Sequence, residues 1–220
     1  MCGRYTQTQG GRKLQEHFNA AVQEVLPRFN VAPTQNALVI HTESPRTIAE
    51  MRWGFVPSWS SDSRSAQLLI NAKSETIAEK RTFKGSFQSN RCLIVADSFY
   101  EWRRQGSSKQ PVRFMLKTEE PFAFAGIWRE VEAEKAFVIV TTEPNNLVRP
   151  VHDRMPVILP KEKYSEWLNN DAPPNQLLDC LRTFPAELMT SYDVDPVVGS
   201  PKVDSPQCIA LYQPVQGSLF

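Results

Sequence analysis

Cys2 stands directly after Met1, so removal of that methionine would leave a chain terminus that carries both an α-amine and a thiol. This pair can trap an aldehyde: the amine condenses with the carbonyl to an imine, and the sulfur closes onto the same carbon as a five-membered thiazolidine. An α-amine has a lower pKa than a cysteine thiol, so the amine attacks first and the ring closure is then intramolecular. The alternative is that Cys2 is only a small residue that permits removal of the methionine, and position alone favours this alternative.

Three further residues have side chains suited to such a reaction. Asn71 follows an apolar run at a predicted strand end, where its amide can donate and accept hydrogen bonds around a carbonyl. Glu101 lies among aromatic residues, and a carboxylate enclosed by rings has a raised pKa that suits proton exchange with an amine and a departing water. His152 titrates near neutral pH and could move a proton to or from a sugar oxygen.

Each of these residues also has a structural interpretation. Asn71 could form a turn or a cap, which is the commoner role of an asparagine at such a position. Glu101 could be an exposed residue between two inward-facing rings, and the sequence favours neither interpretation of this residue over the other. His152 could belong to a local salt-bridge cluster with its neighbours Asp153 and Arg154.

An aromatic loop and a basic stretch together predict a nucleic-acid surface. The loop is Trp53–Trp59, and its rings could stack on unpaired bases, a contact worth about 1–3 kcal/mol per base. Rings in a loop that contains proline can also fill a core. The basic stretch Lys80–Lys84 favours the nucleic-acid interpretation, because lysine and arginine contact phosphates.

The charges are unevenly distributed along the chain, although the net charge of +1 by itself does not favour a nucleic-acid partner. Residues 52–113 hold 11 Lys/Arg and 5 Asp/Glu, whereas residues 114–220 hold 9 and 15. This asymmetry could give one cleft a positive face. It could also be neutralised when the two parts fold against each other.

The composition is that of an ordinary soluble protein. With 220 residues and 41 % hydrophobic content, the chain can bury one core, and we expect a single domain over residues 1–220. It has neither the apolar run of a signal peptide nor a stretch long enough to span a bilayer, so we expect a cytoplasmic protein with no membrane partner. The four cysteines are scattered without a C-x-x-C pair, and we therefore expect reduced thiols, no metal and no cofactor.

The apolar pattern predicts an α+β fold built mainly on antiparallel strands. Residues 12–26 have helical spacing, and later helices are expected at 161–168 and 175–182. Many short strands with few helices between them favour an antiparallel sheet or barrel-like core with short flanking helices over a doubly wound parallel fold. The expected strands are 37–42, 47–53, 68–72, 91–96, 112–117, 122–128, 136–142 and 207–212.

Six motifs occur in order along nearly the whole chain, and in them it resembles the SOS-response-associated peptidase (SRAP) family. The motifs are Met1-Cys2-Gly3-Arg4-Tyr5, Asn30-Val31-Ala32-Pro33, Trp53-Gly54-Phe55-Val56-Pro57, Ile70-Asn71-Ala72, Asp97-Ser98-Phe99-Tyr100-Glu101-Trp102 and His152-Asp153-Arg154-Met155-Pro156. The resemblance implies a sensor of abasic sites in single-stranded DNA, whose N-terminal cysteine forms a stable thiazolidine crosslink with the ring-opened deoxyribose.

The resemblance has further implications for activity, partner and location. It implies self-removal of what precedes the cysteine, so cysteine autopeptidase activity and lyase-like crosslinking chemistry are expected. The implied partner is single-stranded DNA with abasic sites, and the implied protein is a monomer. The implied location is the bacterial cytoplasm, in association with the nucleoid.

Residue roles follow from the resemblance position by position. Cys2 is implied as the nucleophile, Asn71 as the group that positions it and the sugar, Glu101 as the acid/base near the amine, and His152 as the proton-transfer group on the sugar. The residues implied to contact or orient DNA are Arg4, Pro33, Trp53, Trp59, Lys73, Arg81 and Arg154. Lys73 departs from the family, which commonly has arginine there, and it offers a phosphate a point charge in place of a bidentate fork.

Two other functions stay open on the sequence alone. The first is an N-terminal-nucleophile cysteine peptidase or amidase that uses Cys2 on a peptide bond, and it predicts turnover in place of a single-use adduct. The second is a non-covalent single-stranded DNA-binding module in which Cys2 is incidental. It predicts binding that is indifferent to an abasic site.

Overall fold

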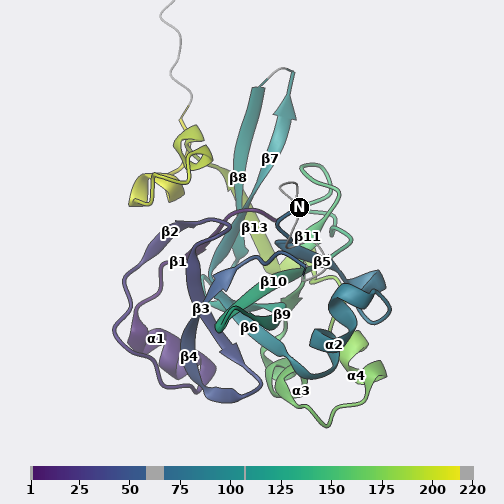
Figure 1. Cartoon of the computed structure of the whole chain (residues 1–220). Coiled ribbons are helices and arrows are strands. Elements are labelled where there is room, and N and C mark those ends of the chain that lie inside the picture. The colour runs from purple at the N-terminus through teal and green to yellow at the C-terminus, as the bar shows by residue number, and fades with distance from the viewer. Residues whose placement is uncertain (1, 58–66, 107, 214–220) are drawn as a thin grey trace, which may run out of the picture.

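A closed ring of five strands forms the centre of the computed structural model, which describes residues 2–57, 67–106 and 108–213 (Figure 1). Antiparallel pairings join β4 to β3, β3 to β6, β6 to β9 and β9 to β10, and a parallel pairing of β10 with β4 closes the ring. The strands of the ring are β3 (Asn36–His41), β4 (Ser44–Trp53), β6 (Arg91–Ala96), β9 (Phe122–Val131) and β10 (Glu134–Thr142).

A second, five-stranded sheet lies beside the ring in the order β13-β8-β7-β1-β2. Its strands are β1 (Tyr5–Gln7), β2 (Arg28–Val31), β7 (Ser98–Gln105), β8 (Ser108–Leu116) and β13 (Met189–Asp193). Three short strands extend the ring: β5 (Asn71–Lys73) and β11 (Met155–Pro156) pair with β10, and β12 (Ile158–Leu159) pairs with β9.

Short helices cover the outside of the strands. Figure 1 shows α1 below β1 and β2, and α2, α3 and α4 gathered together at the lower right. The α-helices are α1 (Gly11–Phe18), α2 (Arg81–Ser89), α3 (Tyr164–Leu168) and α4 (Pro174–Asp179). The 3₁₀ helices are Ser74–Thr76, Lys161–Lys163, Ala186–Leu188, Pro196–Gly199 and Pro206–Ile209.

The ring strands bury both of their faces, which explains why the predicted strand 91–96 is apolar with almost no alternation. One face packs against the helices, among them Phe87 of α2 and Trp167 of α3. The other face packs against the second sheet, where the ring of Tyr5 lies edge-on to Trp53 and Phe124 at centroid distances of 5.1 and 5.6 Å. The N-terminal strand is therefore tied into the central core.

The predicted fold class is confirmed, since the chain is an α+β protein with a mainly antiparallel, barrel-like core and short flanking helices. The strand expected at 91–96 coincides with β6. The strand expected at 68–72 forms only as Asn71–Lys73, with an isolated bridge from Leu69 to Phe55 before it. In the described part of the chain, no helix is both long and apolar enough to cross a membrane.

Two predicted elements are wrong. The helix expected at 12–26 ends at Phe18, because Asn19 takes the left-handed conformation at φ 49° and ψ 46°, and the chain then runs extended through a bridge from Ala21 to Thr47. The strand expected at 207–212 is replaced by the 3₁₀ helix Pro206–Ile209, which begins at a proline whose fixed φ suits the first helical position.

Gly126 and Gly85 give a matched test of how tightly β6 and β9 pack. A Cβ atom on Gly126 would come within 2.5 Å of Ile94 Cδ1 and 2.7 Å of Cys92 Sγ, so Gly126→Ala is expected to lower the free energy of unfolding by about 1–3 kcal/mol. Gly85 lies inside α2, where a Cβ meets no described atom within 4 Å. Gly85→Ala is expected to raise the free energy of unfolding by about 0.5–1 kcal/mol.

Urea unfolding of both variants and of the wild type measures these changes. A Gly126→Ala protein as stable as the wild type would contradict the close packing.

Candidate active site

The first residues of the chain are held by strand pairing. β1 pairs antiparallel with β7. The contact extends to the residue before β1, because the backbone N–H of Tyr100 donates to the carbonyl of Arg4 over 3.0 Å. In this register Cys2 runs alongside the part of β7 that carries Glu101. Two residues that are 99 positions apart in sequence therefore become neighbours through the backbone alone.

A buried polar network fixes this pairing. Asp97 accepts hydrogen bonds from the hydroxyl of Thr6, from the backbone N–H of Thr8 over 2.5 Å and from the hydroxyl of Thr8 over 2.8 Å. The Nε of Arg113 donates to the hydroxyl of Ser98 over 2.8 Å. Because a buried polar group without partners costs free energy, this network penalises any other register of β1 on β7.

The polar network was not identified from the sequence, although a signal for it is present. Asp97 and Arg113 are charged residues inside segments that are otherwise apolar, and both are buried. A charge in such a run must be paired within the fold, since charges are almost never fully buried alone.

Asn71 reaches Cys2 from the other side. It is the first residue of β5, which pairs in parallel with β10 and places Asn71 opposite Ile139. Its Nδ2 donates a hydrogen bond to the carbonyl oxygen of Cys2 over 3.0 Å. Its Oδ1 is buried and has no hydrogen-bond partner among the described residues, so it can accept a hydrogen bond from a group that enters the site.

The thiol of Cys2 is enclosed and held in its neutral form. The residue is 0 % exposed, and its Sγ points to the carbonyl of Arg4 at 3.9 Å. Burial raises the pKa of the Cys2 thiol well above its ordinary value, and the charge of Glu101 raises it further. The sulfur is thus a poor first nucleophile at neutral pH, which agrees with the expected order of attack.

Glu101 has the proton affinity of an acid/base catalyst for neutral pH. The residue is only 2 % exposed, and burial raises the pKa of its carboxyl group to about 7, with a smaller contribution from the charge of Asp153. Both its protonated and its ionised form are thus well populated near pH 7.

His152 lies next to Glu101. Its Nε2 is 3.8 Å from the Glu101 Oε2, and its Nδ1 accepts a hydrogen bond of 3.0 Å from the backbone N–H of Arg154. The neutral ring therefore carries its proton on Nε2, on the side of Glu101. Burial lowers the pKa of His152, which favours this neutral form, while Asp153 at 3.0 Å from Nδ1 supports the charged one.

A hollow of about 600 Å³ adjoins Glu101 and His152. Its lining residues are Glu101, Trp102, Arg104, Lys109, Pro150, Val151, His152 and Asp153. The structure thus brings together Cys2 and Asn71 with Glu101 and His152 beside an open space. The catalytic roles expected of these four residues stay predictions.

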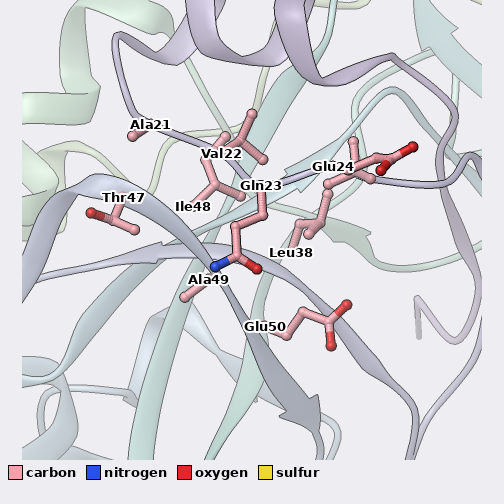
Figure 2. A pocket seen from close by; sticks show the side chains of 10 residues that line it. Ala21, Val22, Gln23, Glu24, Leu38, Thr47, Ile48, Ala49 and Glu50 are labelled. Carbon is pink, nitrogen blue, oxygen red and sulfur yellow. The ribbon is translucent and has the colours of Figure 1, made fainter.

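Another hollow, shown in Figure 2, lies apart from these four residues. It is bounded by residues 21–25, by Leu38 of β3 and by residues 47–50 of β4. Glu24 and Glu50 are the charged residues among those that line it, and none of the residues predicted to act on a substrate lines it.

Comparison with protein families decides the family. The model of the SOS response associated peptidase (SRAP) family matches residues 1–201. The chain belongs to this family.

Relatives of this SRAP protein include named proteins of bacteria and vertebrates. It is 41 % identical over 221 residues to abasic site processing protein YoqW of Bacillus subtilis, covering 95 % of this chain and 99 % of that protein. It is 30 % identical over 244 residues to abasic site processing protein HMCES of Xenopus tropicalis, covering 94 % and 72 %.

Solved structures share the SRAP protein's fold. A protein of Bacteroides thetaiotaomicron superposes with a TM-score of 0.85 at 23 % identity, over 96 % of this chain and 100 % of that one. A phage-related protein of Bordetella bronchiseptica superposes with a TM-score of 0.72 at 30 % identity, over 88 % and 94 %.

Arg4 of the SRAP protein already has partners within the fold. Its Nη1 donates to the Asn30 side chain over 3.2 Å and to the Val198 carbonyl over 2.8 Å, and its Nη2 donates to the Gly199 carbonyl over 3.3 Å. The guanidinium group thus ties the first residues to the segment around Val198. Its predicted contact with DNA stays a prediction, and it would compete with these bonds.

Arg154 is likewise engaged. Its two terminal nitrogens donate to the two carboxylate oxygens of Glu75 over 2.6 and 2.9 Å, and Nη2 also donates to the Thr141 carbonyl over 2.7 Å. These hydrogen bonds lower the pKa of Glu75. A bidentate partner of this kind neutralises most of the charge that Arg154 could offer to a phosphate.

Three more of the residues expected on DNA lie at or near the surface. Lys73 is exposed at the end of β5, two residues after Asn71, and Arg81 is exposed at the start of α2. Pro33 is half-buried after β2. Their contacts with DNA stay predictions.

The expectation for Trp53 is corrected. Trp53 is 0 % exposed, its ring stacks on Phe137, and its Nε1 donates to the carbonyl of Ile70 over 2.9 Å. With no open ring face, Trp53 cannot stack on a base, and it fills the core as the alternative interpretation held. Trp59, the other predicted ring, lies outside the described residues.

The raised pKa of Glu101 predicts how stability depends on pH. The folded protein binds the Glu101 proton up to about pH 7, whereas the unfolded chain releases it near its ordinary value of 4.5. The stabilisation that the folded protein gains from binding the Glu101 proton is thus complete below about pH 4.5 and is lost as the pH rises through about 7. Relative to Glu101→Gln, which cannot ionise, the wild type is expected to lose about 3 kcal/mol across this window.

Urea unfolding of both proteins between pH 4.5 and pH 8 gives this difference directly. Curves of stability against pH that run parallel for the wild type and Glu101→Gln would be incompatible with a raised pKa.

Proposed function

We propose that this SRAP protein captures abasic sites in single-stranded DNA as a thiazolidine crosslink at Cys2. The observation that carries the proposal is the hydrogen bond from Asn71 to the Cys2 carbonyl, made beside a buried Glu101 that faces His152. Relatives named abasic site processing proteins, in Bacillus subtilis and Xenopus tropicalis, support the same substrate.

The proposed reaction begins with opening of the sugar ring. His152 in its charged form gives the Nε2 proton to the ring oxygen, and the ionised Glu101 carboxylate takes the proton of the hydroxyl on C1′. This leaves an aldehyde at C1′ and Glu101 protonated. The α-amine of Cys2 adds to this carbon, and protonated Glu101 gives its proton to the resulting hydroxyl, which departs as water. The product is an imine between the protein terminus and the sugar.

Ring closure completes the crosslink. The Sγ of Cys2 adds to the carbon of the protonated imine, whose nitrogen keeps its proton. The proton of the thiol passes to His152, which regains its charged form, so the thiazolidine forms without any further reactant. A protonated imine next to the sulfur carries a positive charge, which favours the thiolate at this stage of the reaction. The buried thiol, protonated before the DNA binds, thus becomes nucleophilic when its partner carbon is in place.

The same residues support a self-processing step that precedes capture. Because the buried thiol keeps its proton, the ionised Glu101 carboxylate first takes that proton, and Sγ attacks the carbonyl carbon of the preceding residue. The peptide nitrogen receives the proton and leaves as the α-amine, and water then hydrolyses the thioester to a carboxylate and the thiol. We assign the movement of these protons to Glu101 and to His152, whose Nε2 is 3.8 Å from the Glu101 Oε2. Intact mass of the purified protein reports whether this step has occurred.

A crosslinking assay tests the proposed function. Protein that begins at Cys2 is incubated with an oligonucleotide that carries one abasic site, and a heat-stable adduct is expected. Cys2→Ala is expected to abolish the heat-stable adduct. Cys180→Ala removes another buried thiol, whose Sγ donates to Gln176, and is expected to leave the adduct unchanged.

The rival functions give other results in this assay. An undiminished adduct from Cys2→Ala would refute the proposal. Multiple turnovers on a peptide substrate would favour the peptidase, and equal affinity for intact and abasic DNA without an adduct would favour a non-covalent binding module.

Glu101→Gln separates proton transfer from DNA binding. Glutamine has nearly the same shape but holds no transferable proton, so the rate of adduct formation is expected to fall by about 10²–10⁴-fold, the usual contribution of a general acid/base. The dissociation constant for the DNA is expected to change by much less. Rapid-quench time courses and fluorescence anisotropy measure the two quantities, and equal losses in both would contradict a proton-transfer role.

A further inference from the structure

The β7–β8 hairpin extends beyond the sheet to which it belongs. β7 and β8 pair as far as Gln105 opposite Ser108, whereas the neighbouring strands β1 and β13 stop at Phe99 and Val112. No third strand in the described ranges pairs with residues 102–106 and 108–110, which we call the hairpin arm. Figure 1 shows the hairpin projecting from the body of the molecule.

The hairpin arm has positive charges and no negative ones. It contains Arg103, Arg104 and Lys109 but no aspartate or glutamate. Arg103 is paired with Asp193 over 2.5 Å. Arg104 and Lys109 are exposed, and within the described part of the chain neither side chain has an ion pair or a hydrogen bond.

Arg104 and Lys109 lie directly opposite each other across the two strands. Like charges at directly opposite positions destabilise an antiparallel pair of strands, and a two-stranded ribbon is by itself only marginally stable. The two cations therefore cost stability, because neither forms an ion pair with a described acidic side chain, although Glu101 and Asp153 line the same hollow. An anion from outside the chain would remove this cost.

The position of the pair indicates which anion. Arg104 and Lys109 line the same hollow as Glu101 and His152. A deoxyribose in a DNA strand has a phosphate on each side, so a strand with its abasic sugar at Cys2 must place phosphates close to this hollow. Arg4 and Arg154, the two arginines of the family motifs, already hold internal partners.

We propose that Arg104 and Lys109 form a phosphate-binding site for the DNA strand that is captured at Cys2. The proposal rests on the proposed function and adds to it a contact that fixes where the strand leaves the site. The guanidinium of Arg104 can bind a phosphate through two parallel hydrogen bonds, and the ammonium of Lys109 adds a compact charge from the facing strand.

The first experiment measures binding of undamaged single-stranded DNA, so its result does not depend on crosslinking. The variants are Arg104→Gln, Lys109→Gln and the double variant, and the control is Lys117→Gln, an exposed lysine just beyond the other end of β8. Fluorescence anisotropy over a series of salt concentrations gives the affinity and its salt dependence.

The double variant is expected to bind about tenfold more weakly at low salt, and its slope of log affinity against log salt is expected to fall by about 1. The control is expected to match the wild type. An affinity and a slope unchanged in the double variant, or lowered equally in the control, would overturn the proposal.

A second experiment locates the phosphate. Abasic oligonucleotides carry one uncharged methylphosphonate linkage at successive positions on either side of the lesion, and the second-order rate of crosslinking is measured at limiting protein. At one position the neutral linkage is expected to slow the wild type about as much as the double substitution does, with no additional loss when both are combined. Additive losses at every position would mean that the pair contacts no particular phosphate and would overturn the assignment.

The two experiments also separate this inference from the proposed function. If the wild type forms no adduct, the proposed function fails, and the titrations with undamaged DNA still decide whether the pair binds phosphate.

Discussion

The attachment of the first residues to β7 is the constraint on which the site depends. Chain ends are ordinarily poorly ordered, and a nucleophile at a chain end gains nothing from proximity unless the end is fixed. Here the bond from the Tyr100 N–H to the Arg4 carbonyl and the buried network around Asp97 hold the segment in one register. The hydrogen bond from Asn71 to the Cys2 carbonyl then restrains the backbone of Cys2 itself. The fold thus gives a terminus the order of a core residue.

Burial of Cys2 and Glu101 shifts their pKa values and also lowers the stability of the fold at neutral pH. Enclosure raises the pKa of both the Cys2 thiol and the Glu101 carboxyl, so that both groups keep protons that they would release in water. The same enclosure makes the ionised carboxylate unfavourable at neutral pH, which works against the stability of the fold. Such a conflict between local stability and reactivity is typical of catalytic sites. The aromatic core that surrounds Tyr5 supplies the compensating stability.

Much of the site could be predicted from the sequence because its residues lie in short motifs that occur in order along the chain. The residues that these side chains contact lie mostly outside the motifs and could not be predicted. The apolar run at 91–96 predicted β6 correctly, since burial on both faces leaves a continuous pattern. The end of α1 at Asn19 could not be read from apolar spacing, because Val22 and Val25 pack against the core as extended chain. The burial of Trp53 and the pairing of Arg154 with Glu75 depend on segments distant in sequence. Local patterns therefore selected four residues that the fold brings together, and tertiary contacts decided which charges and rings stay available.

The bonds of Arg4 to Val198 and Gly199 connect the two ends of the described chain. Asn30 strengthens the connection, because its amide donates to the carbonyls of Val198, Ser200 and Val203. A fusion partner or a protease cut near residue 198 would weaken these hydrogen bonds, and Arg4, which makes them, is two residues from Cys2. The segment 198–203 is thus one of the supports that hold the first residues of the chain against the fold.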